Sequence, residues 1–181
     1  EQLVQFAQMG SIYYENVIGK KNPTVGIVNI GTEEEKGNQL VKDTYPLLKE
    51  CSTINFIGNV ESREIVNGVC DVIVTEAFVG NVILKFMEGL ASTLLSEIKK
   101  GFYSNLRSKI GALLVKPALK ETLKQFDVSD QGGAPMLGLN GLVVKAHGNS
   151  KAKETKNALI QCIIFKQQNI KEQFSDFVKI I

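Results

Sequence analysis

Residues 71–89 read DVIVTEAFVGNVILKFMEG, and this stretch decides the fold. It predicts a buried strand at residues 71–75, a short loop at 76–80 and a long helix that opens at Asn81. A strand whose end leads through a loop into a helix is the unit that carries ligand sites in open α/β sheets. Unpaired backbone N–H groups at the start of such a helix favour an anion, phosphate above all.

Gly80 and Asn81 stand at the predicted start of this helix. Gly80 lets a ligand come close to the backbone. Asn81 is a good N-cap, and its amide can also donate a hydrogen bond outward. The two residues are therefore candidates for binding phosphate or a carbonyl oxygen. The plainer alternative, in which they only cap the helix, stays open.

Strands and helices alternate around this unit. A continuous apolar, β-branched run at residues 24–30 is typical of a strand buried on both faces, residues 54–60 predict the next strand, and residues 33–50 predict the helix between them. This alternation predicts an α/β protein with a mostly parallel sheet. The other predicted elements are helices at 1–19, 62–67, 103–116, 117–126, 151–168 and 170–181, a glycine-rich loop at 127–141 and a last strand at 142–146.

The predicted helix at residues 81–100 is apolar on most of its circumference, so we expect it to lie buried between layers. No uninterrupted apolar run approaches the roughly 20 residues of a membrane span, so we expect neither a membrane span nor a signal peptide. Residue 1 falls inside a predicted helix without an initiator methionine, so we expect the sequence to start in mid-protein. The three cysteines form no CxxC pair, which favours core packing in a reducing cytoplasm over disulfides or zinc.

Basic residues concentrate between residues 97 and 124, although the net charge is only +2. Four apolar residues there recur at helical spacing, and four cations flank them: Leu106, Ile110, Leu113 and Leu114, with Arg107, Lys109, Lys116 and Lys120. This pattern predicts a protruding amphipathic helical hairpin at residues 102–126 that lies on a membrane surface or contacts an acidic protein. In the alternative, the same leucines form a dimer interface or pack on the domain.

Residues 29–38 follow the first strand and read NIGTEEEKGN. They resemble a phosphate-binding loop without having the P-loop order GxxxxGK[ST]. Lys36 is expected in the first turn of the next helix, where a cation opposes the helix dipole. An anion bound there, with Gly31 and Thr32 in the turn, would explain this placement. The alternative is a solvated lysine beside its glutamates.

His147 is the only histidine and stands where the last predicted strand ends. His147, Gly148 and Ser150 can bind an anion at this turn, and His147 can also polarise a carbonyl group. Gly132 and Gly133 either approach a ligand or make a turn. No dinucleotide fingerprint and no acidic cluster with metal-ligand spacing is present, so we expect no cofactor and no metal.

Five motifs resemble, in order and spacing, those of the PlsX-type phosphate acyltransferases: NIGTEEEKGNQL, INFIGNVESREI, DVIVTEAFVGNVILKFMEG, GALLVKPALK and GGAPMLGLNGLVVKAHGNS. The resemblance covers residues 10–169. It implies a homodimer with the three-layer α/β/α fold of isopropylmalate dehydrogenase-like enzymes. Family members are nearly twice as long, so we expect the N-terminal half to be missing. Glu76 and Ala77 stand where the family has Asp-Gly.

The resemblance also implies the reaction. Inorganic phosphate would attack the thioester of a long-chain acyl-acyl carrier protein, giving acyl-phosphate for phospholipid synthesis in the cytoplasm, at the membrane surface. In this reading, Lys36 neutralises phosphate or the oxyanion, Asn81 orients the phosphate or carbonyl group, and His147 closes the site with Ser150. No nucleic-acid partner is expected. Two alternatives stay open: a phosphotransacetylase-like enzyme that uses coenzyme A thioesters, and a non-catalytic membrane-associated scaffold.

Overall fold

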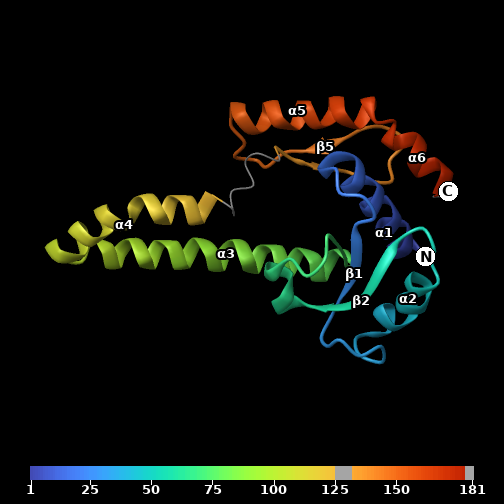
Figure 1. Cartoon of the computed structure of the whole chain (residues 1–181), viewed down its shortest axis with the longest axis horizontal. Coiled ribbons are helices and arrows are strands. Elements are labelled where there is room, and N and C mark those ends of the chain that lie inside the picture. Colours follow the sequence, from blue (N-terminus) through green and yellow to red (C-terminus); the bar gives the residue numbers. More distant parts are fainter. Residues whose placement is uncertain (125–131, 178–181) are drawn as a thin grey trace. The chain divides into compact units, whose positions relative to one another are not determined.

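The computed structural model describes residues 1–124 and 132–177. The chain forms two compact units, each described here by itself. Unit 1 comprises Glu1–Glu76 and Gln131–Ile181, and unit 2 comprises Ala77–Asp130 (Figure 1).

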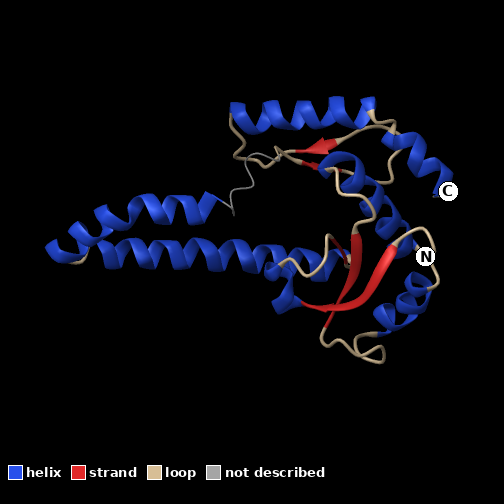
Figure 2. Cartoon of the chain, viewed as in Figure 1, coloured by secondary structure: helices blue, strands red, loops and turns tan. Residues whose placement is uncertain are grey.

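Unit 1 is built on a parallel sheet of three strands in the order β2-β1-β3, drawn in red in Figure 2. The strands are β1 (Thr24–Asn29), β2 (Asn55–Glu61) and β3 (Val72–Val74). The central strand β1 buries Val25 and Ile27 completely, as its continuous apolar run predicts. The expectation of an α/β protein with a parallel sheet is confirmed.

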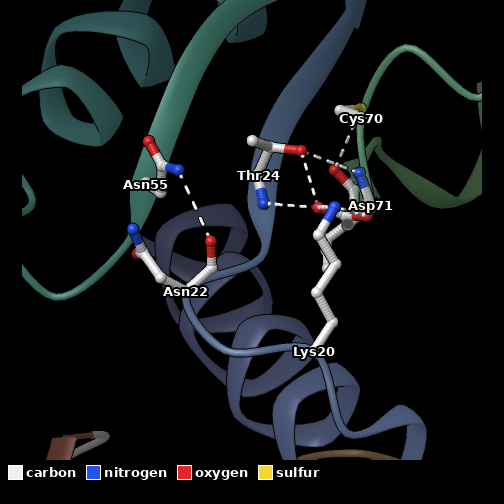
Figure 3. A network of polar contacts seen from close by, with 7 residues as sticks. Lys20, Asn22, Thr24, Asn55, Cys70 and Asp71 are labelled. Carbon is white, nitrogen blue, oxygen red and sulfur yellow. Dashed lines mark hydrogen bonds and ion pairs between the residues drawn. The ribbon is translucent and has the colours of Figure 1, made fainter.

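Asp71 joins β3 to β1 at their amino ends (Figure 3). Its carboxylate accepts hydrogen bonds from the backbone N–H of Thr24 at 2.8 Å and from the Thr24 hydroxyl at 2.9 Å. It also forms an ion pair with Lys20 at 2.8 Å. The Lys20 ammonium and the Thr24 donors lower the pKa of Asp71 to about 2. This network fixes the alignment of the two strands.

Helices α1 (Gln2–Tyr13) and α2 (Gln39–Lys49) pack on this sheet. Leu3 and Ala7 of α1 and Leu48 of α2 are buried in one cluster with the strand residues. After Tyr13 the chain continues as a π-helix, Tyr14–Ile18, which ends at Gly19 in the left-handed conformation. The short helix predicted at residues 62–67 is present as the 3₁₀ helix Ser62–Asn67.

The prediction of a helix from residue 33 is wrong at its start. The side chain of Asn38 accepts the backbone N–H of Val41 at 3.0 Å, which makes Asn38 the N-cap of α2. Gly37 just before it has a φ of 100°, which no helix contains. Lys36 therefore lies in a loop, and the argument from the helix dipole does not apply to it.

The last strand also differs from the prediction. β5 (Val144–Lys145) pairs antiparallel with β4 (Ala134–Pro135) in a separate two-stranded sheet and does not extend the parallel sheet. The backbone N–H of Met136 donates to the carbonyl of Val143 at 2.8 Å and closes a hairpin loop between them. Two helices follow, α5 (Ala152–Gln167) and α6 (Ile170–Phe177), and Ile170 and Phe174 of α6 pack on Met9 of α1.

Unit 2 contains α3 (Ala77–Phe102) and α4 (Leu106–Lys124), which lie side by side (Figure 1). No residue of α3 is buried, so the expectation that this helix is buried between layers is wrong for the described chain. α4 is one helix and not two. It continues through Pro117, which has no N–H to donate to the carbonyl of Leu113. The hairpin insertion at residues 102–126 stays a prediction.

Among the described residues, α3 is the single helix that is long and apolar enough to cross a membrane. α3 meets this criterion by its length and composition only, and charged residues interrupt the apolar runs of the helix.

Candidate functional site

The loop at residues 30–38 is attached to the carboxyl end of β1 by Asn29. This side chain is only 6% exposed. Its Nδ2 donates a hydrogen bond to the carbonyl oxygen of Lys36 at 3.0 Å, and its Oδ1 accepts the backbone N–H of Ile30 at 2.8 Å. One buried amide therefore binds both the beginning and the end of this 30–38 loop.

Asn59 of the neighbouring strand β2 binds the middle of the same loop. Its Nδ2 donates to the carbonyl of Glu33 at 2.8 Å and, more weakly, to that of Thr32 at 3.5 Å. The Oδ1 of Asn59 is buried and has no hydrogen-bond partner among the described residues. A buried acceptor without a donor costs about 1–3 kcal/mol, so a ligand or water that donates to it would be bound favourably.

Two glycines permit the close packing of the loop. A Cβ atom on Gly31 would lie 2.7 Å from Oε2 of Glu33 and 3.2 Å from Cγ of Lys36, so the Lys36 stem lies over a bare backbone. Gly37 has the left-handed φ that favours glycine, and a Cβ there would collide with the amide of Asn29.

The charges of the loop are separated. Glu34 turns to α2, where it accepts from Lys49 at 2.6 Å and from the Tyr45 hydroxyl at 3.3 Å. The Lys49 ammonium lowers the pKa of the Glu34 carboxyl group. The Lys36 side chain, by contrast, is exposed and forms no ion pair or hydrogen bond within the described part of the chain. The backbone of Lys36 is held while its ammonium group is available to neutralise an anion.

The structure changes the argument for Gly80 and Asn81. α3 begins at Ala77, so both residues lie inside the helix, and the prediction that Asn81 is the N-cap is wrong. Alanine at position 77 is a good helix former, and the helix starts directly after Glu76. Asn81 is exposed and belongs to unit 2. Its role in phosphate binding stays a prediction.

His147 lies in a closed turn before α5. Its Nδ1 accepts the backbone N–H of Asn149 at 3.2 Å, and its carbonyl accepts that of Ser150 at 3.0 Å. With Nδ1 accepting, the neutral ring carries its proton on Nε2, which can donate to an anion or a carbonyl oxygen. The Ser150 hydroxyl is buried without a hydrogen-bond partner among the described residues, and Gly148 has open space around it.

Close packing in the structure explains why glycine stands at positions 132 and 133. Gly132 has a φ of 74°, and a Cβ there would collide with the backbone N–H of Ala158 in α5. A Cβ on Gly133 would lie 2.9 Å from the carbonyl oxygen of Lys145. The Gly133 carbonyl also accepts from the Gln161 side chain at 3.1 Å. A ligand role for either glycine stays a prediction.

The structure thus brings the predicted residues together in two groups. Gly31, Thr32 and Lys36 share the 30–38 loop, and His147, Gly148 and Ser150 share the turn before α5. No hydrogen bond or ion pair between described residues joins the loop to the turn. The arrangement of Lys36, Asn81 and His147 around one substrate therefore stays a prediction.

Sequence reasoning missed Asn29 and Asn59. A signal was present for Asn29, which is a polar residue at the carboxyl end of a mostly apolar strand, but β2 also contains Asn55 and Glu61, so nothing in the sequence distinguished Asn59. Such residues often bind the loop that follows, since a buried amide must find hydrogen-bond partners.

In unit 2, the apolar stripe of α4 is exposed along its length. Its members are Leu106, Ile110, Leu113 and Leu114. The flanking cations Arg107, Lys109, Lys116 and Lys120 are exposed as well. Contact with a membrane or with a carrier protein stays a prediction.

Comparisons with known proteins agree with one another. The family model described as "Fatty acid synthesis protein" matches residues 1–173. The chain is similar to the phosphate acyltransferase of Brevibacillus brevis, with 51% identity over 171 residues, which is 94% of this chain and 51% of the relative. Proteins of the same name from Clostridium acetobutylicum (50% identity; 97% and 53%) and Clostridium botulinum strain Alaska E43 (52% identity; 96% and 52%) are equally similar. The chain spans about half the length of these curated relatives.

Proposed function

Since the chain belongs to the fatty acid synthesis protein family, of the PlsX type, we propose that the whole protein is a phosphate acyltransferase. It transfers a long-chain acyl group from acyl-acyl carrier protein to inorganic phosphate, in fatty acid and phospholipid metabolism. The observation that carries the proposal is the high identity to curated phosphate acyltransferases over nearly the whole chain.

The reaction needs no protein nucleophile. A phosphate oxygen attacks the thioester carbonyl, and the tetrahedral oxyanion then expels the carrier thiolate, which takes up a proton. The protein must hold phosphate beside the thioester and stabilise the oxyanion that forms, so catalysis is a matter of positioning and electrostatic stabilisation. The fixed backbone and available ammonium group of Lys36 support a role in neutralising phosphate. The Nε2–H of His147 supports a role at the carbonyl oxygen, and the role proposed for Asn81 is to orient the phosphate or carbonyl group.

We further propose a homodimer in the cytoplasm, peripherally attached to the membrane, with the three-layer isopropylmalate dehydrogenase-like fold in the whole protein. The exposed leucines and cations of α4 support a surface that contacts anionic lipid or the acidic acyl carrier protein.

The test is an assay of the full-length protein. Palmitoyl-acyl carrier protein is supplied with and without inorganic phosphate, thiol release is followed with a thiol reagent, and acyl-phosphate is trapped as the hydroxamate. We expect release that depends on phosphate, with one hydroxamate per thiol. Activity with coenzyme A thioesters alone would indicate a phosphotransacetylase-like enzyme instead. Absence of turnover with both donors would indicate a non-catalytic scaffold.

A further inference from the structure

A cavity of about 300 Å³ lies in unit 1, between the loop of the β4–β5 hairpin and the corner where α5 meets α6. Its size is at the lower end of the range for small-molecule sites. Its larger apolar side chains are Met136, Leu139, Leu142, Phe165 and Phe174. None of the residues that line it belongs to the 30–38 loop or to the turn at residues 147–150.

Both walls of this cavity are fixed by contacts. The hydrogen bond from Met136 to Val143 closes the hairpin loop. Gly138 at its tip has a φ of 83° and a Cβ there would lie 3.5 Å from Met9, so the loop rests on α1. On the other wall, the rings of Phe165 and Phe174 meet edge to face with centroids 5.8 Å apart. The cavity is therefore preformed.

The hairpin loop exposes apolar surface that its own fold does not explain. Leu139 is 47% exposed and Leu142 is 39% exposed. Single exposed leucines are common, but a group of them around one cavity is typical of a binding site.

The charged residues of the lining favour an anion. Lys166 and Lys171 are exposed and form no ion pair among the described residues, and neither does Glu172, the one acidic residue of the lining. Among the described lining residues, two cations stand against one carboxylate. A ligand that matches both features has an aliphatic chain and an anionic head.

We propose that this cavity binds an anionic amphiphile, a fatty carboxylate or an alkyl or acyl phosphate. The chain lies among Leu139, Leu142 and Phe165, and the head lies near Lys166 and Lys171. At roughly 30 Å³ per chain atom, the volume that a water molecule occupies in the liquid, the cavity holds about ten atoms. This site shares no residue with the 30–38 loop or the turn at residues 147–150. Binding in the cavity does not depend on the proposed function, and only the metabolic source of the acyl chain rests on it.

Calorimetric titration of the full-length protein tests whether the cavity binds the alkyl chain of the ligand. The probes are hexyl, octyl, decyl and dodecyl phosphate, kept below their critical micelle concentrations. Affinity should rise by up to about fourfold per methylene group and level off near ten carbons. Inorganic phosphate should not displace decyl phosphate. Displacement would place the amphiphile at the reacting centre and overturn the proposal. The measurement needs no turnover, so it can succeed or fail independently of the acyltransferase assay.

Variants test the location. Leu142→Trp fills the cavity and should weaken decyl phosphate binding at least about tenfold. Leu159→Trp, at an exposed position of α5 outside the lining, should have no effect. If Leu142→Trp does not fold, Leu139→Trp at a more exposed position makes the same test. Equal affinity in the cavity and control variants would overturn the proposal. So would a change of oligomeric state on gel filtration, which would show that a second copy of the chain occupies the cavity.

The charge is tested in the same titration. Lys171→Glu should weaken binding about fivefold, whereas Lys156→Glu, on α5 outside the lining, should not. Glu172→Gln should tighten binding, because it removes the carboxylate that the described lining places beside the proposed head. Decyltrimethylammonium should bind more weakly than decyl phosphate. Equal binding of the cationic probe would contradict the anion site.

Discussion

The side-chain amide of Asn29, at the end of β1, donates a hydrogen bond of 3.0 Å to the carbonyl oxygen of Lys36. The contact links a buried strand residue to the backbone of an exposed cation in the next loop. The Lys36 ammonium itself has no partner among the residues described. The backbone of Lys36 is therefore fixed while its ammonium group is available. This arrangement is expected of a residue that binds an anion without a large conformational change.

The first prediction concerns Lys36. Lys36→Ala should lower phosphate-dependent turnover at least about tenfold, or roughly 1.4 kcal/mol in barrier, because a charge that neutralises phosphate is lost. Its free energy of unfolding in urea should stay close to wild type, since the side chain is exposed and forms no ion pair or hydrogen bond within the described part of the chain. Lys42→Ala, at an exposed position of α2, is the matched control and should retain turnover. Wild-type kinetics in Lys36→Ala would exclude this role.

The second prediction concerns the positioning role of Asn29. Asn29→Ala should cost about 1–3 kcal/mol of stability, because two backbone groups lose their buried partner. Asn29→Asp keeps the acceptor for Ile30 but loses the donor to Lys36. Its second carboxylate oxygen faces the Lys36 carbonyl oxygen in a buried site, so this variant should also lose stability. Where it remains folded, it should raise the KM for phosphate. A purely structural role would leave the KM of a folded Asn29→Asp variant unchanged.

The third prediction concerns Asn81. Because this residue lies inside α3, Asn81→Ala removes no cap and replaces asparagine with a better helix former. Stability in thermal unfolding should be unchanged or raised by a few tenths of a kcal/mol, while phosphate-dependent activity falls if Asn81 contacts the substrate. A destabilised variant would contradict the position that the structure gives this residue.

The fourth prediction concerns pH and Asp71. Its pKa is lowered from 3.8 to about 2 by Lys20 and Thr24, so the charged carboxylate stabilises the folded state. That contribution should be complete above about pH 4 and should be lost as the pH falls toward 2. The stability difference between wild type and Asp71→Asn should therefore shrink over this interval in urea titrations. Glu50→Gln, at an exposed carboxylate directly after α2, is the control.

The fifth prediction concerns the apolar stripe of α4. Leu106 is 74% exposed and Ile110 is 56% exposed. Inserting such side chains into a bilayer is worth up to about 1.5–3 kcal/mol each. Leu106→Glu combined with Ile110→Glu should abolish co-sedimentation with anionic phospholipid vesicles and leave the dimer and activity in solution intact. Monomerisation or unfolding would support the alternative, in which these residues form a dimer interface or pack on the domain.

The sequence by itself determined the strands β1, β2 and β3, their parallel arrangement and the family. The apolar run at residues 25–28 favours burial on both faces, and this preference is local to the run, whereas Ile30 beyond the end of β1 is 80% exposed. The order of several motifs along the chain carried the family resemblance, which the family model then confirmed.

Only the tertiary structure decided where Lys36, Asn81 and the last strand lie. α2 begins only after Asn38, because Gly37 before it has a φ of 100°, and the Asn29 side chain from β1 leaves no room for a Cβ atom at Gly37. Likewise β5 pairs with β4 because a backbone hydrogen bond closes the hairpin at Met136. The hydrophobic periodicity of a segment indicates only which of its own residues are buried. Loop conformation and strand pairing depend on partners elsewhere in the chain, which no local pattern specifies.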